Sequence, residues 1–321
     1  MTGKLDGRVA IVVGAGQTPG RNVGNGRAVA TVFAREGARL VLVDRDRDRV
    51  QATADELTAD LDAEVVVVAT DIATDDGPAT VIDAALDAFG GIDVLHNNVG
   101  IGADDGPPHR LEDDAYDLIM DVNLRAMWRT CRVAVPHLRR SDHGAIVNVS
   151  SLAAVAAAPN LTAYKLSKAG VNALTQNLAL SNAKYGVRAN AIMPGFVDTP
   201  MGVDAAAAAF DLDRDEYAAG RAARVPLGRQ GSAWDVAAAA LFLVSDDSAW
   251  ITGVVLPVDG GQSARIGGAD VAPVRPEGSR RRGADGDPTR RGRRRVVTRP
   301  QRSHLVKVWP LHADDHAWRP S

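Results

Sequence analysis

The chain of 321 residues is poor in cysteine, with Cys131 alone, poor in aromatic residues, at 4%, and free of long apolar runs. A single cysteine excludes an internal disulfide and a metal site made of several thiolates, and it favours a reducing, cytoplasmic location. No segment approaches the roughly 20 apolar residues of a membrane span, and residues 1–7 carry no apolar signal core. We therefore expect neither secretion nor membrane insertion.

The seven histidines give little support for a metal site. None of the four in the body of the chain shows a spacing such as His-x-x-x-His, which would place two imidazoles on one helix face. Those in the body of the chain are scattered, at His96, His109, His137 and His143. We expect no metal at the functional site.

The net charge of −3 conceals an uneven distribution. Residues 270–321 hold 13 Lys and Arg against 6 Asp and Glu, whereas residues 1–269 hold 24 against 34. The basic segment has little apolar periodicity, a composition that is typical of disorder. We predict one catalytic domain over residues 1–268 and a disordered, Arg-rich tail over residues 269–321, which is either an accessory segment or the product of an altered reading frame.

Short, nearly continuous apolar runs alternate with longer helical patterns along residues 9–258. The runs predict strands at Val9–Val13, Leu40–Val43, Glu64–Ala69, Val94–Asn97, Ala145–Val149, Arg188–Ile192 and Val254–Val258. The patterns between them predict helices at Arg27–Glu36, Arg47–Leu61, Gly77–Phe89, Asp114–Leu138, Thr162–Lys184 and Ala233–Val244. Such an alternation predicts an α/β fold with a doubly wound, Rossmann-like parallel sheet of about seven strands.

Three polar residues carry the clearest chemical signal. Tyr164 and Lys168 are four residues apart in a predicted helix, so their side chains project from one face, and Ser151 ends an apolar strand. A free tyrosine ionises near pH ~10, so a phenolate that takes an alcohol proton near neutral pH needs a lowered pKa, which a nearby ammonium group favours. The serine hydroxyl would stabilise a substrate oxygen, so the three residues predict carbonyl/alcohol chemistry.

The strand end Asn148-Val149-Ser150-Ser151, followed by Tyr164-Lys165-Leu166-Ser167-Lys168, resembles the short-chain dehydrogenase/reductase family. The interval to the tyrosine favours Ser151 over Ser150 as the catalytic serine. The resemblance covers residues 5 to about 265 and implies a fourth catalytic residue at Asn123, which shapes a local helix and holds water for a proton relay through Lys168. It also implies homodimers or homotetramers, formed through the helices around 114–138 and 162–184.

A glycine-dense loop follows the first predicted strand, where backbone amides at a helix N-terminus can hold a pyrophosphate. The residues that match the family are Gly14, Gly24, Asn25 and Gly26, with about six extra residues before Gly24. Within that insertion, Arg21 faces either phosphate or solvent.

Asp44 ends the second strand, where an acid accepts hydrogen bonds from ribose hydroxyls and repels a 2′-phosphate. This favours NAD, with NADP possible because Arg45 and Arg47 are near. The resemblance implies further cofactor contacts at Asp71, Ile72, Asn98, Gly100, Pro194, Gly195, Val197 and Thr199, besides Tyr164 and Lys168. A helix cap is the alternative role of Asp71, and residues 201–229 resemble the family's mobile substrate lid.

The sequence therefore predicts an NAD(H)-dependent oxidoreductase that interconverts a secondary alcohol and a ketone. The alternatives are an NADP-dependent carbonyl reductase, such as a 3-oxoacyl reductase, and a catalytically silent protein of this fold whose basic tail binds nucleic acid. A small-molecule substrate is the expected partner, and neither nucleic acid nor a membrane is expected.

Overall fold

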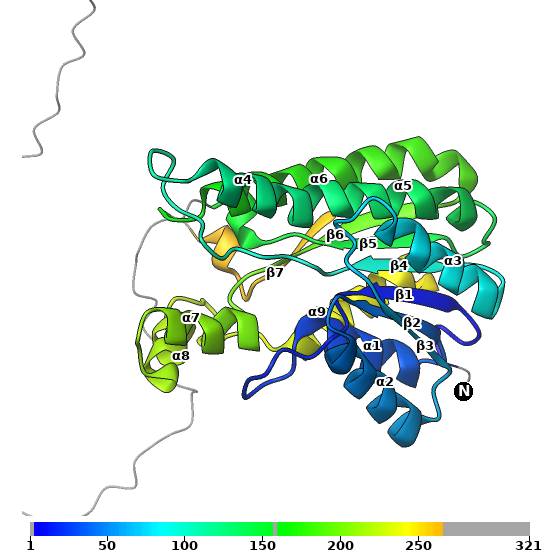
Figure 1. The fold of residues 1–321 in the computed structure, drawn as a ribbon, viewed down its shortest axis with the longest axis horizontal. Coiled ribbons are helices and arrows are strands. Elements are labelled where there is room, and N and C mark those ends of the chain that lie inside the picture. The colour runs from blue at the N-terminus through cyan, green and yellow to red at the C-terminus, as the bar shows by residue number, and fades with distance from the viewer. Residues whose placement is uncertain (1–2, 157–158, 266–321) are drawn as a thin grey trace, which may run out of the picture. The chain divides into compact units, whose positions relative to one another are not determined.

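Seven parallel strands form one sheet in the order β3-β2-β1-β4-β5-β6-β7. We describe residues 3–156 and 159–265 of a computed structural model of the chain (Figure 1). The strands are β1 (Val9–Val13), β2 (Arg39–Asp44), β3 (Val65–Ala69), β4 (Val94–Asn97), β5 (Ala145–Val149), β6 (Arg188–Pro194) and β7 (Val255–Val258). The predicted doubly wound α/β fold is confirmed, and the predicted tail at residues 269–321 lies outside the described residues.

Helices cover both faces of the sheet, and each face has its own apolar core. On one face lie α1 (Asn25–Arg35), α2 (Arg47–Leu61) and α9 (Ala233–Val244). On the other lie α3 (Gly77–Phe89), α4 (Asp113–Met120), α5 (Ala126–Leu138) and α6 (Thr162–Asn182). Because strands buried on both faces can be apolar at every position, β1 and the four central residues of β2 show the continuous runs that the sequence predicts.

One predicted helix is in fact three segments. The stretch predicted as Asp114–Leu138 consists of α4, a π-helical turn over Asp121–Arg125, and α5. The turn contains Asn123, whose amide is bound to the backbone of Ile101, on the loop that follows β4. A π-turn inserts one residue into the helical ladder and is common at functional sites, so here it allows Asn123 to reach that loop.

Two short helices, α7 (Ala205–Ala209) and α8 (Arg214–Ala222), follow β6 and stand apart from the sheet layers, as Figure 1 shows. They occupy the segment that was predicted as a substrate lid. Within the described residues, no helix is both long enough and apolar enough to cross a bilayer.

Candidate active site

Ser151 and Tyr164 meet at the carboxyl edge of the sheet, where the Ser151 hydroxyl is close enough to the Tyr164 phenol to favour its ionised form. Ser151 directly follows β5, where its hydroxyl also accepts the N–H of Ala153 at 3.1 Å and starts a 3₁₀ turn. Tyr164 is the third residue of α6, which runs back along the face of the sheet next to β6. The two side chains therefore come from adjacent elements and converge on one point.

Lys168 lies one turn after Tyr164, and its side chain is 2% exposed. Its Nζ donates a hydrogen bond to the carbonyl of Val149 at 2.9 Å and lies 5.7 Å from the centre of the Tyr164 ring. Burial lowers the pKa of Lys168 to about 8. The lysine is thus held at the end of β5, on the helix face that carries the tyrosine, as the spacing predicts.

The predicted lowering of the tyrosine pKa by Lys168 is wrong for the protein without a bound nucleotide. Burial raises the pKa of Tyr164 above its ordinary value, and only the hydrogen bond with Ser151 opposes this effect. The physical reason is that the aromatic ring loses its hydration while the ammonium is directed at the Val149 carbonyl.

The two adjacent serines have different surroundings. The buried hydroxyl of Ser150 donates to the Lys168 carbonyl at 3.2 Å, so this side chain connects α6 to the end of β5. Ser151, and not Ser150, acts on the Tyr164 phenol, whose pKa it lowers. The spacing argument that separated the two residues agrees with this arrangement.

Asn123 connects the catalytic helix to the loop after β4. Its amide accepts the N–H of Ile101 at 2.8 Å and donates to the carbonyl of Ile101 at 2.9 Å and to Ser167 Oγ at 3.1 Å. Ser167 in turn donates to the carbonyl of Tyr164 at 2.8 Å. Sequence reasoning missed Ser167, although its position three residues after the tyrosine, on the same helix face, was a usable signal.

The glycine loop has the close approaches that a dinucleotide cradle needs. Gly14 adopts a left-handed φ of +82°, and a Cβ on Gly26 would lie 1.8 Å from the Gly14 carbonyl oxygen. Asn98 donates from Nδ2 to that same oxygen at 3.1 Å. Asn25 contributes a buried Oδ1 that has no partner among the described residues. These features fit a pyrophosphate at the start of α1.

The extra residues of this loop form a segment whose two ends are joined by hydrogen bonds of the Gln17 side chain. Gln17 accepts the N–H of Gly24 at 3.0 Å and donates to the Asn22 carbonyl at 3.2 Å, which fastens the two ends of the insertion together. Arg21 extends outward and forms an ion pair with Asp215 at the start of α8. Of the two orientations that the sequence left open, the solvent-facing one is correct, but with a carboxylate partner on the lid.

Asp44 lies beside the cradle at the end of β2. Its carboxylate accepts the N–H groups of Gly16 at 3.0 Å and Asp46 at 3.1 Å, while Arg45 and Arg47 are exposed. Asp71 accepts the N–H of Ala73 at 2.9 Å and so closes a local turn. It does not cap α3, which begins six residues later at Gly77, and its neighbour Ile72 is buried in the core.

The strand β6 leads into the remaining predicted contacts, Pro194, Gly195, Val197 and Thr199. Gly195 fits closely against the loop after β7, since its Cβ would lie 2.3 Å from Gln262 Oε1. Thr199 accepts the N–H of Gly202 at 3.1 Å and starts the lid. Gly100, on the loop after β4, would place a Cβ 3.0 Å from Lys168 Nζ.

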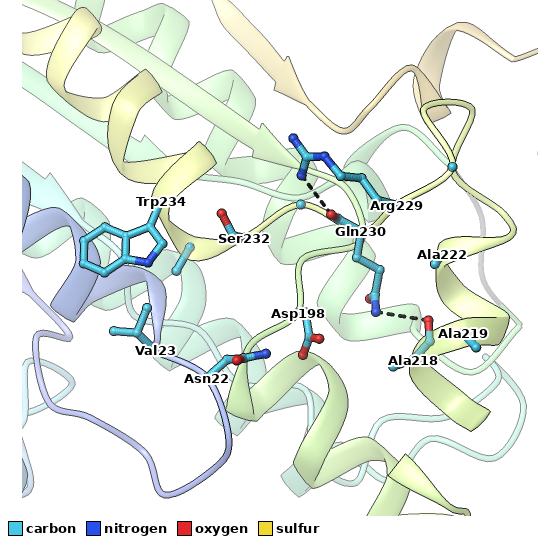
Figure 2. Close-up of a pocket in the computed structure, with 13 residues that line it drawn as sticks. Asn22, Val23, Asp198, Ala218, Ala219, Ala222, Arg229, Gln230, Ser232 and Trp234 are labelled. Atoms are coloured by element: carbon cyan, nitrogen blue, oxygen red, sulfur yellow. Dashed lines mark hydrogen bonds between the residues drawn. The ribbon is translucent and has the colours of Figure 1, made fainter. Parts of the chain in front are cut away.

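A cleft of about 480 Å³ lies between the glycine loop, α8 and the start of α9 (Figure 2). Asn22, Asp198, Gln230 and Trp234 are among its lining residues, and the catalytic trio is not. In the described part of the chain, no three His, Cys, Asp or Glu side chains are grouped as metal ligands would be.

Comparison with known proteins assigns the family. The family model described as enoyl-(acyl carrier protein) reductase matches residues 21–263. The 2-(R)-hydroxypropyl-CoM dehydrogenase of Xanthobacter autotrophicus is 35% identical over 80% of this chain and 99% of its own length. The levodione reductase of Leifsonia aquatica is 34% identical over 82% of this chain and 97% of its own length. The chain belongs to the short-chain dehydrogenase/reductase family.

Solved structures agree with this assignment. This short-chain dehydrogenase/reductase superposes on levodione reductase with a TM-score of 0.77 at 31% identity, over 82% of this chain and all of that one. It superposes on carveol dehydrogenase from Mycobacterium avium, solved in complex with NAD, with a TM-score of 0.76 at 30% identity and the same coverage. The protein is an oxidoreductase of this family, as the sequence predicts.

Proposed function

We propose that this short-chain dehydrogenase/reductase is an NAD(H)-dependent enzyme that interconverts a secondary alcohol and a ketone. The observation that carries the proposal is the convergence of Ser151, Tyr164 and Lys168, with Lys168 buried one helical turn after the tyrosine and bonded to the end of β5. A phenol placed beside a serine hydroxyl and a lysine, near a dinucleotide cradle, has the chemistry of a general acid/base for a carbinol oxygen.

Each residue has a distinct role in the proposal. During oxidation Tyr164 accepts the hydroxyl proton, and Ser151 donates a hydrogen bond to the substrate oxygen as it becomes a carbonyl. Lys168 supplies positive charge near the phenol and binds the ribose, while Asn123 holds the loop and the helix that frame the proton path. When bound, oxidised nicotinamide would supply the hydride acceptor and a positive charge that favours the Tyr164 phenolate.

In the proposal, the glycine loop and the strand ends around it bind the dinucleotide. Gly14, Gly24, Asn25 and Gly26 would hold the pyrophosphate, Asp44 the adenosine ribose, and Asp71 with Ile72 the adenine. Because the Asp44 carboxylate faces the cradle while Arg45 and Arg47 are exposed, we favour NAD over NADP. Asn98, Gly100, Pro194, Gly195, Val197 and Thr199 would line the nicotinamide half.

Names of relatives support the substrate class at a coarse level. Hydroxypropyl-CoM dehydrogenase, levodione reductase and carveol dehydrogenase are named for alcohols or ketones that differ in size and polarity. What they share is the carbinol or carbonyl centre, which is the part of a substrate that Ser151 and Tyr164 would contact. A small-molecule alcohol or ketone is therefore the partner that we propose.

Self-association and a cytoplasmic location belong to the same proposal. Leu118 of α4, Trp128 of α5 and Leu166 of α6 are between 43% and 55% exposed, which leaves large apolar side chains uncovered on these helices. A dimer or tetramer formed through this face would remove them from water. The lone thiol of Cys131 is buried and free, as a reducing compartment allows.

Absorbance at the reduced-nicotinamide band tests the proposal, with NAD and NADP supplied separately and a panel of secondary alcohols. We expect NAD-dependent turnover that falls by about a thousandfold or more in Tyr164→Phe, because the variant lacks the acid/base proton. Tyr185→Phe is the matched control, since Tyr185 is 42% exposed and lies beyond the end of α6. Equal turnover in Tyr164→Phe and wild type would contradict the assignment.

A further inference from the structure

An aspartate outside the predicted site holds the helix that carries Tyr164. The Asp105 carboxylate accepts the N–H of Tyr164 at 2.8 Å through Oδ2 and the N–H of Ala163 at 3.1 Å through Oδ1. Asp105 lies on the loop after β4, 59 residues before the tyrosine. The contact is therefore set by the tertiary fold.

These two amides are the ones that a helix cap normally satisfies. The residue at the N-cap position of α6 is Leu161, whose side chain cannot accept a hydrogen bond. Ala163 and Tyr164 are the second and third residues of the helix, whose N–H groups have no partner inside it. Asp105 supplies from a distant loop the acceptor that Leu161 lacks.

The contact is reciprocal. Thr162, the first residue of α6, donates from Oγ1 to the Gly106 carbonyl at 2.6 Å, and Asp105 Oδ1 also accepts the N–H of Gly106 at 2.8 Å. Asp104, directly before it, has a left-handed φ of +61°, an uncommon conformation for a residue with a side chain. The loop is thus held in one conformation by bonds in both directions.

The same loop covers the tyrosine ring. A Cβ on Gly102 would lie 3.3 Å from Tyr164 Cδ2, so the backbone there is next to the ring. At the near end of the loop, Asn123 binds both backbone groups of Ile101 and also Ser167, which donates to the Tyr164 carbonyl. The N–H and the C=O of Tyr164 are therefore fixed to two ends of one loop.

We propose that Asp105 is a positioning residue of the reaction, which fixes the backbone of Tyr164 and couples the loop at residues 100–106 to the orientation of the phenol. This inference rests on the proposed function, in which Tyr164 is the acid/base. Asp105 does not contact the reacting atoms. Its effect is to hold the phenol within hydrogen-bond reach of Ser151 and the substrate oxygen, where small displacements cost much of the rate.

Steady-state kinetics on the full-length chain test the role, with Asp105→Ala, Asp105→Asn and, as matched control, the neighbouring exposed residue in Asp104→Asn. We expect kcat of Asp105→Ala to fall by about 10- to 100-fold, because the tyrosine is displaced, while KM for NAD changes by less than about twofold, because the glycine loop is untouched. Asp105→Asn keeps one acceptor oxygen and should recover part of kcat, and Asp104→Asn should match wild type.

Amide hydrogen exchange over residues 161–168 provides a readout without turnover. We expect faster exchange in Asp105→Ala, intermediate exchange in Asp105→Asn and wild-type exchange in Asp104→Asn, while residues 94–97 of β4 stay protected in every variant. A kcat in Asp105→Ala within about twofold of wild type would overturn the proposal. If the wild-type protein turns over no alcohol or ketone, the proposed function fails, and unchanged exchange in Asp105→Ala would then separately overturn the role of Asp105.

Discussion

Arg21 and Asp215 form an ion pair, 2.5 Å between Nη1 and Oδ1, that joins the glycine-rich loop to the first turn of α8. The two residues are 194 positions apart in the chain. Close by, the N–H of Arg21 donates to Asp204 at 3.2 Å, and Arg214 forms ion pairs with both Asp198 and Asp204. The glycine loop and the segment of α7 and α8 are therefore linked by charge.

Breaking this link should weaken dinucleotide binding. In Arg21→Glu the glycine loop and α8 repel each other, so we expect KM for NAD to rise by about two- to fivefold and the free energy of unfolding to change little, because both side chains are exposed. Steady-state kinetics at low and high salt measure the effect, which should shrink as salt increases. The double variant Arg21→Glu with Asp215→Arg restores the opposite charges and should recover the KM; no recovery would refute the link.

Gly26 should tolerate no side chain. Its Cβ would lie 1.8 Å from the Gly14 carbonyl oxygen, so Gly26→Ala must push α1 away from the cradle. We expect a loss of about 1–3 kcal/mol in the free energy of unfolding and a loss of NADH binding by fluorescence titration. Gly91→Ala is the control, since a Cβ there would meet nothing within 4 Å. Normal NADH affinity in Gly26→Ala would show that the loop does not hold the nucleotide.

Asp44 should determine the choice of dinucleotide. Asp44→Asn keeps an acceptor for the Gly16 and Asp46 amides but removes the charge that repels a 2′-phosphate. We expect the ratio of kcat/KM for NADP to that for NAD to rise by about tenfold or more. Asp48→Asn, at an exposed position in the first turn of α2, should leave the ratio unchanged. An unchanged ratio in Asp44→Asn would contradict the preference for NAD.

His96 should make the fold sensitive to acid. Its ring is fully buried on β4 against Phe33, and both nitrogens lack partners among the described residues. Burial lowers its pKa from 6.5 to about 4, so between these values the unfolded chain binds more protons than the folded one. The contribution of His96 should therefore lower stability by up to about 3 kcal/mol as the pH drops from 6.5 to 4, and this contribution should level off below that range.

Urea unfolding between pH 4 and pH 7 measures this effect. We expect His96→Leu to lose that part of the pH dependence, because the variant has no group to protonate at this position, while His109→Gln, at an exposed position, should keep it. The same slope in His96→Leu and wild type would assign the acid sensitivity to other groups.

The strand positions could be predicted from the sequence because each is an apolar run that ends at a polar or glycine residue. Val9–Val13, Val94–Asn97 and Ala145–Val149 agree with the structure to the residue. The spacing of Tyr164 and Lys168 likewise depends only on the helical repeat. Local pattern was sufficient wherever the relevant contact lies within one element.

Features that depend on distant partners could not be predicted in this way. The π-turn at Asn123 forms where the side chain binds Ile101, and Asp105 caps a helix that begins 57 residues later. Arg21 has a partner that only the folded lid supplies. The direction of the Tyr164 pKa shift was also missed, because the spacing reveals the nearby lysine but not the loss of water around the ring.

The Gln17 side chain, which bonds to both Asn22 and Gly24, closes the insertion at its base. Gly14, Gly16 and Gly26 keep their close contacts outside the closed segment. We therefore expect that residues can be added to this closed segment, or removed from it, while the close glycine contacts stay the same. In evolution or in engineering, the contact between this insertion and α8 can therefore change while the glycine contacts of the proposed nucleotide site are kept.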